Sequence, residues 1–489
     1  MKHTLFILAA VFTAITAFGQ GADDAMLFSQ TFYQGTAKSM ALGGAMGAIG
    51  ADMTAISINP AGMGVYRSDE LTFGLGLTDN QSHSTYYGNS TDIQNNFGMN
   101  IPNFGFVHAK EEGNVGDFRF SQFGISFTRT NDFNSNTFAS GFNPSSSLMD
   151  NYLGQIPDGY NPDKFKDDFP FTLSPAWESY LLDIDGDGYF TTPVPQGTLQ
   201  QEQNKSYKGR SEEWNIAYSA NSNDRLFLGV DLCFNHIKRI GTKIHSEHTT
   251  NATSTEFETN FKQLDFTEDI SSNGWGVTAK LGAIYYLTTW MRVGAAYHSP
   301  SIFSFDESWK TVTEASYIPN DYYDRYYNRT SPISNYKYNF FSPQKFIGSM
   351  AFIINHRGLV SIDADVLNYG RAKFDCEDFD YTDVNKDIKN TFKTTMNFRV
   401  GTEWQYKNVY FRGGCAYYGS PFGLGEQSFA VKKASCGLGI QVNEGVLFDF
   451  AYEFSHGKQQ YTLYAYDDIE PVCQTLNRHA FAVTMKVKF

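Results

Sequence analysis

The sequence carries a regular alternation of apolar and polar side chains, which is clearest at its C-terminal end. Every second residue from Phe481 to Phe489 is apolar, and the residues between them are Ala, Thr or Lys. Because successive side chains of a β-strand point to opposite faces, a period of two predicts a strand with one apolar and one polar face.

The same alternation returns in many segments upstream. In residues 275–281, 360–366, 398–404 and 448–455, aromatic and branched residues share one face and charged or small residues share the other. A soluble sandwich would bury its apolar faces and expose its charges, whereas a membrane barrel turns apolar faces to lipid and polar faces to a wet or plugged lumen. Carboxylates and cations together on the polar faces favour the barrel.

The spacing of these segments gives a second argument. About 14 strands can be delimited, and bacterial barrels require an even number. Long connections alternate with tight turns such as Asn443-Glu444, and the longest connection covers residues 132–210. The sequence therefore predicts an all-β fold, a transmembrane antiparallel barrel with long loops outside the cell and short turns in the periplasm. The predicted strands lie near 69–78, 99–109, 117–131, 211–222, 224–240, 271–287, 290–306, 335–355, 358–374, 391–406, 408–419, 430–442, 445–457 and 476–489.

The first residues have the features of a secretory signal peptide. A positive start at Lys2 precedes an apolar run that is too short to span a bilayer. We therefore expect a signal peptide at residues 1–19, a separate segment at 20–68 and the barrel at 69–489. The last strand ends on the aromatic residue Phe489, and this feature resembles the signal that the barrel assembly machinery recognises. Together these features predict a location in the outer membrane of a Gram-negative cell.

Composition agrees with a barrel and argues against some functions. Aromatic residues reach 16% and charged residues only 18%, as the aromatic girdles of a barrel would produce. The mean hydropathy is -0.37, because lumen-facing polar residues offset the lipid-facing ones. A formal net charge of -14 argues against nucleic acid as a partner. The five cysteines are too few and odd in number for a dense disulfide framework, although Cys376 and Cys473 fall in loops and could pair.

Residues 20–68 lack strand alternation and are rich in small side chains. Small residues allow a compact plug inside a narrow barrel, Pro60 fixes a turn, and Asn59 can bond freed backbone groups. The segment resembles the N-terminal hatch of the FadL family of outer-membrane transporters, which includes TodX-like proteins. The residues that carry the hatch resemblance are Gly43, Gly44, Asn59, Pro60, Ala61 and Gly62.

The resemblance implies a function as well as a fold. Family members are expected to take up long-chain fatty acids and other hydrophobic compounds, which bind first among the extracellular loops and then in the lumen. Movement of the hatch would release the ligand sideways into the membrane, through a gap at a kinked third strand. We expect a monomer whose partners are this ligand and the lipid of the outer membrane.

The third predicted strand contains a slip in its alternation. Phe118 and Phe120 lie in one phase, whereas Phe123 and the apolar residues after it lie in the other. A slip of one residue requires a bulge or a kink if both sets are to face lipid. We predict missing strand pairing at this point, and an ordinary bulge with no role in transport is the alternative. The candidate residues of a lateral gate are Ser121, Gln122 and Gly124.

A fatty-acid site needs an apolar pocket and one or two cations or donors for the carboxylate. Four cations fall in the lumen-facing phase and are candidates for this role: Lys280, Arg292, Arg399 and Arg412. The same cations could instead be neutralised by lumen-facing acids, namely Asp363, Asp365, Glu403 and Glu453. Phase alone leaves both interpretations open.

The long loop contains carboxylates at alternate positions among glycines, at Asp183, Asp185 and Asp187. This pattern resembles the first half of a calcium-binding loop, in which oxygen ligands converge on a hard cation. The usual closing glutamate is missing, because Val194 stands at the twelfth position. Calcium in an extracellular loop and a plain acidic turn are both open, and no cofactor is required by the function.

The sequence shows no arrangement of side chains that indicates catalysis. There is no recoverable Ser, His and acid set and no metal-ligand spacing among the ten histidines, so we predict that the protein is not an enzyme. A surface binding or adhesion barrel, or a haem-binding receptor, is the competing function. An adhesin needs no plug of small residues, and an energy-coupled haem receptor carries a larger plug domain. The hatch therefore favours transport.

Overall fold

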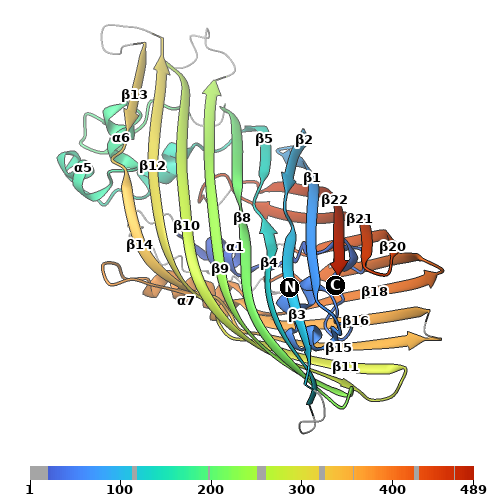
Figure 1. Ribbon diagram of the computed structural model, residues 1–489. Coiled ribbons are helices and arrows are strands. Elements are labelled where there is room, and N and C mark those ends of the chain that lie inside the picture. The colour runs from blue at the N-terminus through green and yellow to red at the C-terminus, as the bar shows by residue number, and fades with distance from the viewer. Residues whose placement is uncertain are drawn as a thin grey trace, which may run out of the picture.

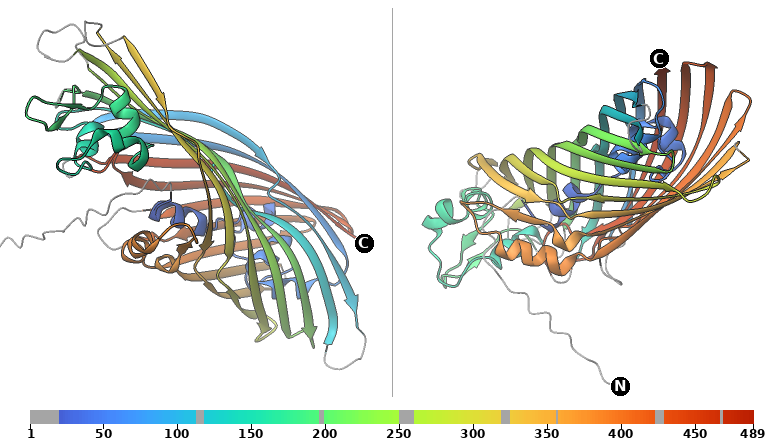
Figure 2. Two further views of the ribbon diagram at one scale, coloured as in Figure 1. Left: turned by 90° about the vertical axis from the view of Figure 1, so that its left-hand side faces the viewer. Right: turned by 60° about the horizontal axis from the view of Figure 1, so that its bottom comes forward.

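The protein folds into a closed β-barrel with helices inside the ring of strands and at one end of it (Figures 1 and 2). The computed structural model describes residues 20–112, 118–195, 199–249, 260–318, 325–355, 357–422, 429–466 and 469–489. The predicted signal peptide, residues 1–19, lies outside the described residues.

The described residues form a ring of 14 antiparallel strands, which confirms the predicted fold class. The ring closes because β1 (Glu70–Tyr86) pairs with β22 (Val472–Lys488), from Glu70 opposite Lys488 to Thr85 opposite Cys473. Closure gives the wall strands neighbours on both sides over most of their length, as strands in lipid require.

Four wall strands are each built from two consecutive segments. They are β2 (Asn89–Asn100) with β3 (Asn103–Glu111), β4 (Phe118–Asp132) with β5 (Ser135–Asn143), β11 (Met291–His298) with β12 (Ile302–Tyr317), and β14 (Ser334–Phe341) with β15 (Lys345–Ile354). The remaining wall strands are β8 (Leu199–Ser222), β9 (Leu226–Thr249), β10 (Phe261–Tyr286), β16 (Gly358–Asn368), β18 (Thr394–Tyr406), β19 (Val409–Tyr418), β20 (Val431–Asn443) and β21 (Val446–Tyr461). Short strands β13 (Tyr326–Thr330) and β17 (Lys373–Asp375) add to β12 and β14.

An apolar belt covers the outward face of the barrel. On β1, Leu71, Phe73, Leu75 and Leu77 are exposed while the residues between them are buried. The same alternation runs along β9 and β10, as the sequence predicted. Exposed apolar side chains on every second position are stable only where lipid covers them, so this belt marks the membrane-spanning part of the wall.

Several strands continue beyond the predicted limits on the side of the long connections. β8, β9 and β10 have 24, 24 and 26 residues, so the predicted loop at 132–210 is shorter than expected and β5 begins inside it. The extensions project past the belt. Their outward residues face water and are polar, so the sequence pattern there lacks the alternation that revealed the belt.

A cap covers part of the end that bears the long connections, which is the extracellular end in bacterial barrels. Its core contains Met149, Leu173 and Leu181, which pack with Leu264 and Tyr317 of the extended strands. Figure 2 shows the cap at one end of the barrel. Its elements are α4 (Leu148–Leu153), η2 (Pro162–Lys164), α5 (Phe165–Asp168), α6 (Leu173–Glu178) and the hairpin β6 (Asp183–Ile184) and β7 (Phe190–Thr191).

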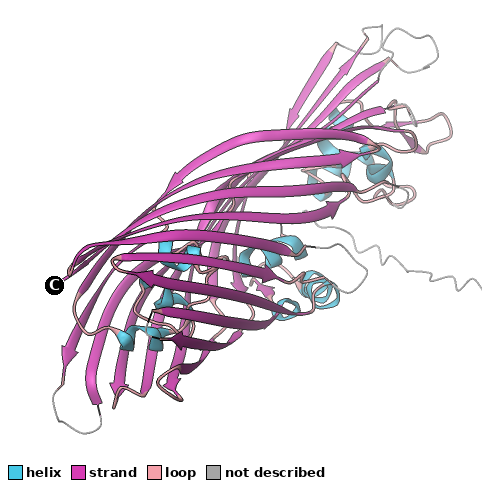
Figure 3. Ribbon diagram, turned by 90° about the vertical axis from the view of Figure 1, so that its right-hand side faces the viewer, coloured by secondary structure: helices cyan, strands magenta, loops and turns pink. Residues whose placement is uncertain are grey.

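The remaining helices lie within the ring of strands or at its rim (Figure 3). The N-terminal ones are α1 (Ala22–Ser29), α2 (Ala37–Ala41), α3 (Met53–Ile58) and η1 (Pro60–Val65). Two later ones, η3 (Tyr369–Arg371) and α7 (Thr382–Thr391), share an apolar cluster with α1 through Phe28 and Ile388. None of the helices in the described part of the chain is both long and apolar enough to cross a membrane.

Candidate functional site: the hatch and the barrel lumen

The segment at 20–68, called the hatch below, is bonded to the inner face of the wall. Asn59 ends α3, and its side-chain amide donates to Gly47 O at 2.7 Å and to Ala283 O of β10 at 3.3 Å. The side-chain oxygen of Asn59 accepts from Ala61 N at 3.2 Å, and Pro60 starts the next helical turn. One residue therefore joins two turns of the hatch to the wall.

Two glycines allow the hatch to lie directly on the wall. Gly43 and Gly44 have φ angles of +63° and +80°, in the left-handed region that side chains disfavour. A Cβ on Gly43 would stand 2.8 Å from the backbone oxygen of Cys415, and one on Gly44 would stand 3.2 Å from the Arg399 side chain. Of the other predicted hatch residues, Gly62 accepts from Ala51 N at 3.0 Å.

A buried charge network fastens the hatch to the last strands. Asp52 of the hatch lies 2.7 Å from Lys486 of β22, which also lies 3.4 Å from Asp449 of β21. Arg412 contacts Asp449 and Glu403, both at 2.5 Å. Because breaking a buried pair leaves an uncompensated charge, such a network fixes the position of the hatch.

The other predicted lumen cations also contact acids or the hatch. Arg399 lies 2.5 Å from Asp365, and Lys280 lies 2.6 Å from Glu213 and donates to Ser57 O of the hatch. Arg292 instead donates to Ile49 O of the hatch at 3.2 Å.

For Lys280, Arg399 and Arg412 the geometry is therefore the neutralised arrangement. Three of their acidic partners, Glu213, Asp231 and Asp449, were not foreseen. The predicted acid Glu453 pairs with Lys433 instead. Binding of a ligand carboxylate by any of the four cations stays a prediction.

The prediction that strand pairing is missing at Ser121, Gln122 and Gly124 is wrong. All three residues are paired on both sides, with β3 and with β8. The phase slip is an irregularity between Phe118 and Phe120 in the pairing with β8. Gly124 faces the hatch rather than an opening, because a Cβ there would stand 2.5 Å from the sulfur of Met63.

The wall is interrupted higher up, between the lower part of β2 and the start of β5; at the upper end of β2 the side chains of Asn89 and Thr91 donate to Ser140 O and Phe138 O of β5. The ladder of β3 and β4 ends at Asn103 opposite Thr128; beyond it, β2 pairs with β1 and β5 with β8, and the described residues contain no ladder between β2 and β5. Pro102, which has no N–H, separates β2 from β3.

Side-chain exposure supports the interruption. Phe97 and Met99 on β2 are 75% and 79% exposed, whereas Leu75 and Leu77 on the fully paired β1 are 49% and 54% exposed. A lipid-facing side chain with neighbours on both sides loses about half of its surface to them. The greater exposure of Phe97 and Met99 indicates that no described strand pairs with this part of β2 on the side of β5.

The hatch reaches this interruption. Phe32 N donates to Thr130 O at 2.6 Å and Gln34 N donates to Arg129 O at 3.0 Å, so the hatch chain bonds the part of β4 that is paired with β8 on one side and lies beyond the β3 ladder on the other. A lumen cavity of about 190 Å³ lies there and is lined by Phe32, Ser82 and residues of β4, β5, β20, β21 and β22. The hatch, the cavity and the wall gap are thus neighbours.

Two lysines that the sequence analysis did not select lack a carboxylate partner. Within the described residues no carboxylate lies within 4.0 Å of Lys345 or Lys205. Lys345 is buried, and its ammonium stands 5.4 Å from the centre of the Tyr33 ring of the hatch. Lys205 faces the upper lumen, 3.3 Å above the ring of Tyr461. The alternation on β8 and β15 marks both as inward, but only the structure shows that they are unpaired.

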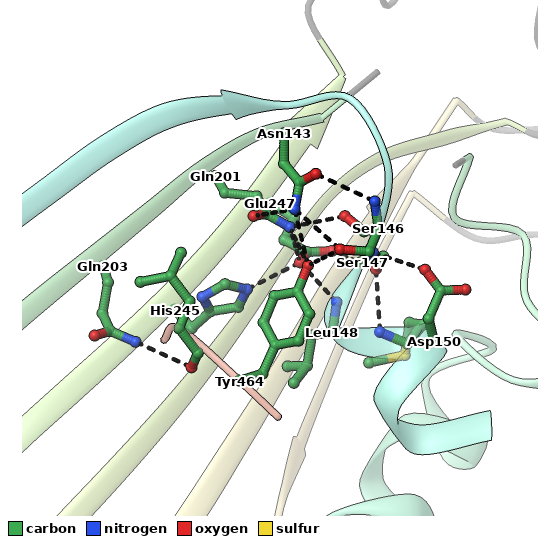
Figure 4. Close-up of polar contacts among 12 residues, drawn as sticks. Asn143, Ser146, Ser147, Leu148, Asp150, Gln201, Gln203, His245, Glu247 and Tyr464 are labelled. Carbon is green, nitrogen blue, oxygen red and sulfur yellow. Dashed lines mark hydrogen bonds and ion pairs between the residues drawn. The ribbon is translucent and has the colours of Figure 1, made fainter. Parts of the chain in front are cut away.

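Below the cap, a buried polar cluster joins three connections (Figure 4). Glu247 of β9 accepts from Ser147 Oγ at 2.5 Å and from Leu148 N at 2.8 Å, which fixes the start of α4. Gln201 of β8 donates to Glu247 at 2.8 Å and to the hydroxyl of Tyr464 at 2.9 Å. These bonds hold the cap over the upper lumen.

The three predicted calcium ligands lie on the exposed β6–β7 hairpin. Asp185 Oδ1 accepts from Asp187 N at 3.0 Å and from Tyr189 N at 2.8 Å, so the turn closes on its own bonds. No three His, Cys, Asp or Glu side chains of the described ranges gather as a metal site would require.

The described cysteines are all free, so the predicted pairing of Cys376 with Cys473 is wrong.

Calcium binding at Asp183, Asp185 and Asp187 stays a prediction with a direct test. If the hairpin rearranges around calcium, adding the ion should raise the unfolding temperature of the native protein, because a ligand that binds only the folded state stabilises it. The triple Asp→Asn variant should show no response. If calcium and a chelator change the unfolding temperature of the two proteins equally, the prediction is wrong.

A closed transmembrane barrel whose lumen holds its own N-terminal segment is an outer-membrane barrel of the plugged, transporting class. Residues 208–488 match the model of the family described as outer membrane protein transport protein (OMPP1/FadL/TodX), and the chain belongs to this family. The protein is therefore an outer-membrane transporter of hydrophobic compounds.

Solved structures show the same fold at low sequence identity. A FadL homologue of Pseudomonas aeruginosa has a TM-score of 0.55 at 12% identity, over 94% of this chain and 100% of that one. The toluene transporter TodX of P. putida has a TM-score of 0.53 at 13% identity, over 93% and 98%. The CymD monoaromatic hydrocarbon channel has a TM-score of 0.52 at 10% identity, over 93% and 97%. No curated protein matches the sequence.

Proposed function

We propose that the protein imports long-chain fatty acids or similar amphipathic carboxylates. The observation that supports this choice is a pair of lysines with no carboxylate of the described residues within 4.0 Å, Lys205 in the upper lumen and Lys345 beside the hatch. A purely apolar cargo needs no cation, whereas a carboxylate gains a charge-assisted bond at each lysine. The two positions follow one another from the extracellular end towards the hatch.

The proposed route begins under the cap and ends at the wall. The ligand enters the upper lumen, where Lys205 and the aromatic ring of Tyr461 meet it, and moves down to the cavity beside Phe32. The hatch strand at Phe32–Gln34 then leaves β4, which opens the interruption beside β2 to the membrane. Two backbone bonds hold that strand to β4, so its release costs far less than unfolding any wall strand.

Lys205 should make capture dependent on pH. It lies beyond the belt on the extracellular side, and burial together with the nearby ammonium of Lys243 lowers the pKa of Lys205 to about 7. Lys205 is therefore charged below that pH and neutral above it. Affinity for a fatty-acid carboxylate should fall roughly tenfold between pH 6 and pH 8.5, a range in which the lysine loses most of its charge.

Tryptophan fluorescence or a displaced fluorescent fatty acid would measure this affinity in the purified protein. In the matched variant Lys205→Met, binding should be weak and independent of pH over this range. If the affinity of the native protein does not change with pH, Lys205 does not contact the ligand.

Lipid mass spectrometry of the purified protein tests the class of cargo. The native protein and the variant Lys345→Met are compared, and loss of co-purified fatty acids only in the variant supports a carboxylate cargo.

The competing function is surface binding without transport, as in an adhesin or a haem receptor. The bonds between hatch and wall gap argue for transport, because an adhesin needs no movable contact inside its lumen. Uptake of a labelled fatty acid by cells that express the protein, against cells that lack it, separates the two functions.

A further inference from the structure

A group of cations occupies the outward face of three adjacent strands directly above the apolar belt. The continuous apolar belt ends at Phe127 on β4, Trp214 on β8 and Phe234 on β9, which are paired with one another in register, and the exposed Ile240 lies further along β9, opposite Lys208. The outward residues that follow them towards the extracellular end are Arg129, Glu212, Arg210, Lys208, His236 and Lys238. We call these six residues the outward basic patch.

The geometry of the patch leaves most of its positive charge available. Arg210 and Lys238 are directly opposite each other in the β8–β9 ladder. Glu212 sits between Arg210, at 2.5 Å, and Arg129, at 3.6 Å, and holds both guanidinium groups in place. Lys208 and Lys238 are exposed, and neither has an ion-pair partner among the described residues. The patch thus contains four permanent cations and one carboxylate, in a chain whose net charge is -14.

The patch is local. The first two outward residues above the belt are Asp79 and Gln81 on β1, and Ser304 and Asp306 on β12, where no cation stands. Next to the patch, the ring of Trp275 stacks on His236 with centroids 4.3 Å apart. An aromatic residue at this depth marks the level of the lipid headgroups. The cations of β4, β8 and β9 therefore face the headgroups of the outer leaflet.

We propose that the outward basic patch binds the phosphate groups of a glycolipid of the outer leaflet. Guanidinium and ammonium groups are the donors that phosphate prefers, and lysines close to an anionic lipid surface add to the attraction. The apolar belt below the patch receives the acyl chains of the same molecule. Since Arg129 O also accepts from Gln34 N of the hatch, the bound glycolipid lies beside the interruption in the wall. The proposal depends only on the outer-membrane location and not on the identity of the cargo.

The test compares two double variants of the full-length protein. Lys208→Gln with Lys238→Gln removes two exposed charges of the patch and leaves the Arg210 and Glu212 pair intact. The control, Lys337→Gln with Lys432→Gln, removes two exposed outward lysines elsewhere, on β14 and β20. Binding of bisphosphorylated lipid A to the detergent-solubilised proteins is measured by native mass spectrometry, and heat-modifiable mobility in gels verifies that each barrel is folded.

We expect lipid A binding to fall roughly 30-fold in the patch variant, because each lysine near an anionic lipid surface contributes about a fivefold factor. The control should bind as the native protein does. Dephosphorylated lipid A should bind all three proteins equally weakly, and inorganic phosphate should not displace the lipid. Equal lipid A binding by the patch and control variants, or equal binding of the phosphorylated and dephosphorylated lipids, would overturn the proposal.

Discussion

Deletion of residues 20–58 is expected to turn the protein into an open, water-filled pore. In the intact chain the hatch fills the lumen and its Asp52 neutralises Lys486. Without it the lumen keeps a charged and hydrated lining of lysine, arginine and carboxylate side chains. A 14-strand ring is wider than the eight-strand barrels whose interiors side chains can fill, so conductance in planar bilayers should rise roughly tenfold or more.

The same deletion should make cells sensitive to large hydrophilic antibiotics and abolish selective uptake of fatty acids. A deletion of 183–191, which removes the exposed β6–β7 hairpin and leaves the hatch in place, is the matched control and should keep the pore closed. A hatch-deleted barrel with native strand content and no conductance would show that other segments, such as α7 at the rim, seal the lumen by themselves.

Ser135→Trp is expected to stop transport at the wall interruption. Ser135 lines the cavity of about 190 Å³ beside the hatch, and an indole side chain would fill most of it. If cargo passes through this cavity, uptake of labelled fatty acid should fall at least tenfold, about the effect expected when an essential passage is occupied. Capture at Lys205 should be unchanged, because that side chain lies above the cavity. Ser135→Ala keeps the cavity open and should transport normally.

A photoreactive fatty acid distinguishes sideways exit from passage straight through the barrel. During uptake, sideways exit should label the outward residues Met99 and Ile101 beside the gap more strongly than Phe398 on the opposite strands. Ser135→Trp should remove that difference. Normal uptake by the Trp variant together with uniform labelling of the belt would rule out the lateral route. Gly124→Trp is a poorer test, because its side chain would push against Met63 and displace the hatch.

Sequence alone was enough to predict the barrel. The alternation in residues 481–489 and in the other belt segments follows from a physical rule that acts on each strand separately: one face meets lipid and the other meets the lumen. Strand number, the even count and the position of the tight turns follow from the same rule. The hatch was also visible, because residues 20–68 break the rule and Asn59-Pro60 forms a local turn.

The tertiary structure decided which groups meet. The alternation placed Arg399 and Arg412 on the lumen side of their strands, which made them candidates for binding the ligand. In the structure Asp365, Glu403 and Asp449 lie on neighbouring strands and neutralise them. The wall gap was sought at the phase slip near Phe120, where a bulge absorbs the extra residue and pairing continues. It lies instead above Pro102, between the lower part of β2 and the start of β5.

The physical reason is that alternation records only the surroundings of one strand, whereas ion pairs and ladder breaks depend on the register between strands that lie far apart in the sequence. A one-residue shift between two strands changes every partner across them while the pattern within each strand stays the same. The free lysines Lys205 and Lys345 are the clearest case. Their sequence environment equals that of the paired lumen cations, and only the folded ring shows that no carboxylate of the described residues reaches them.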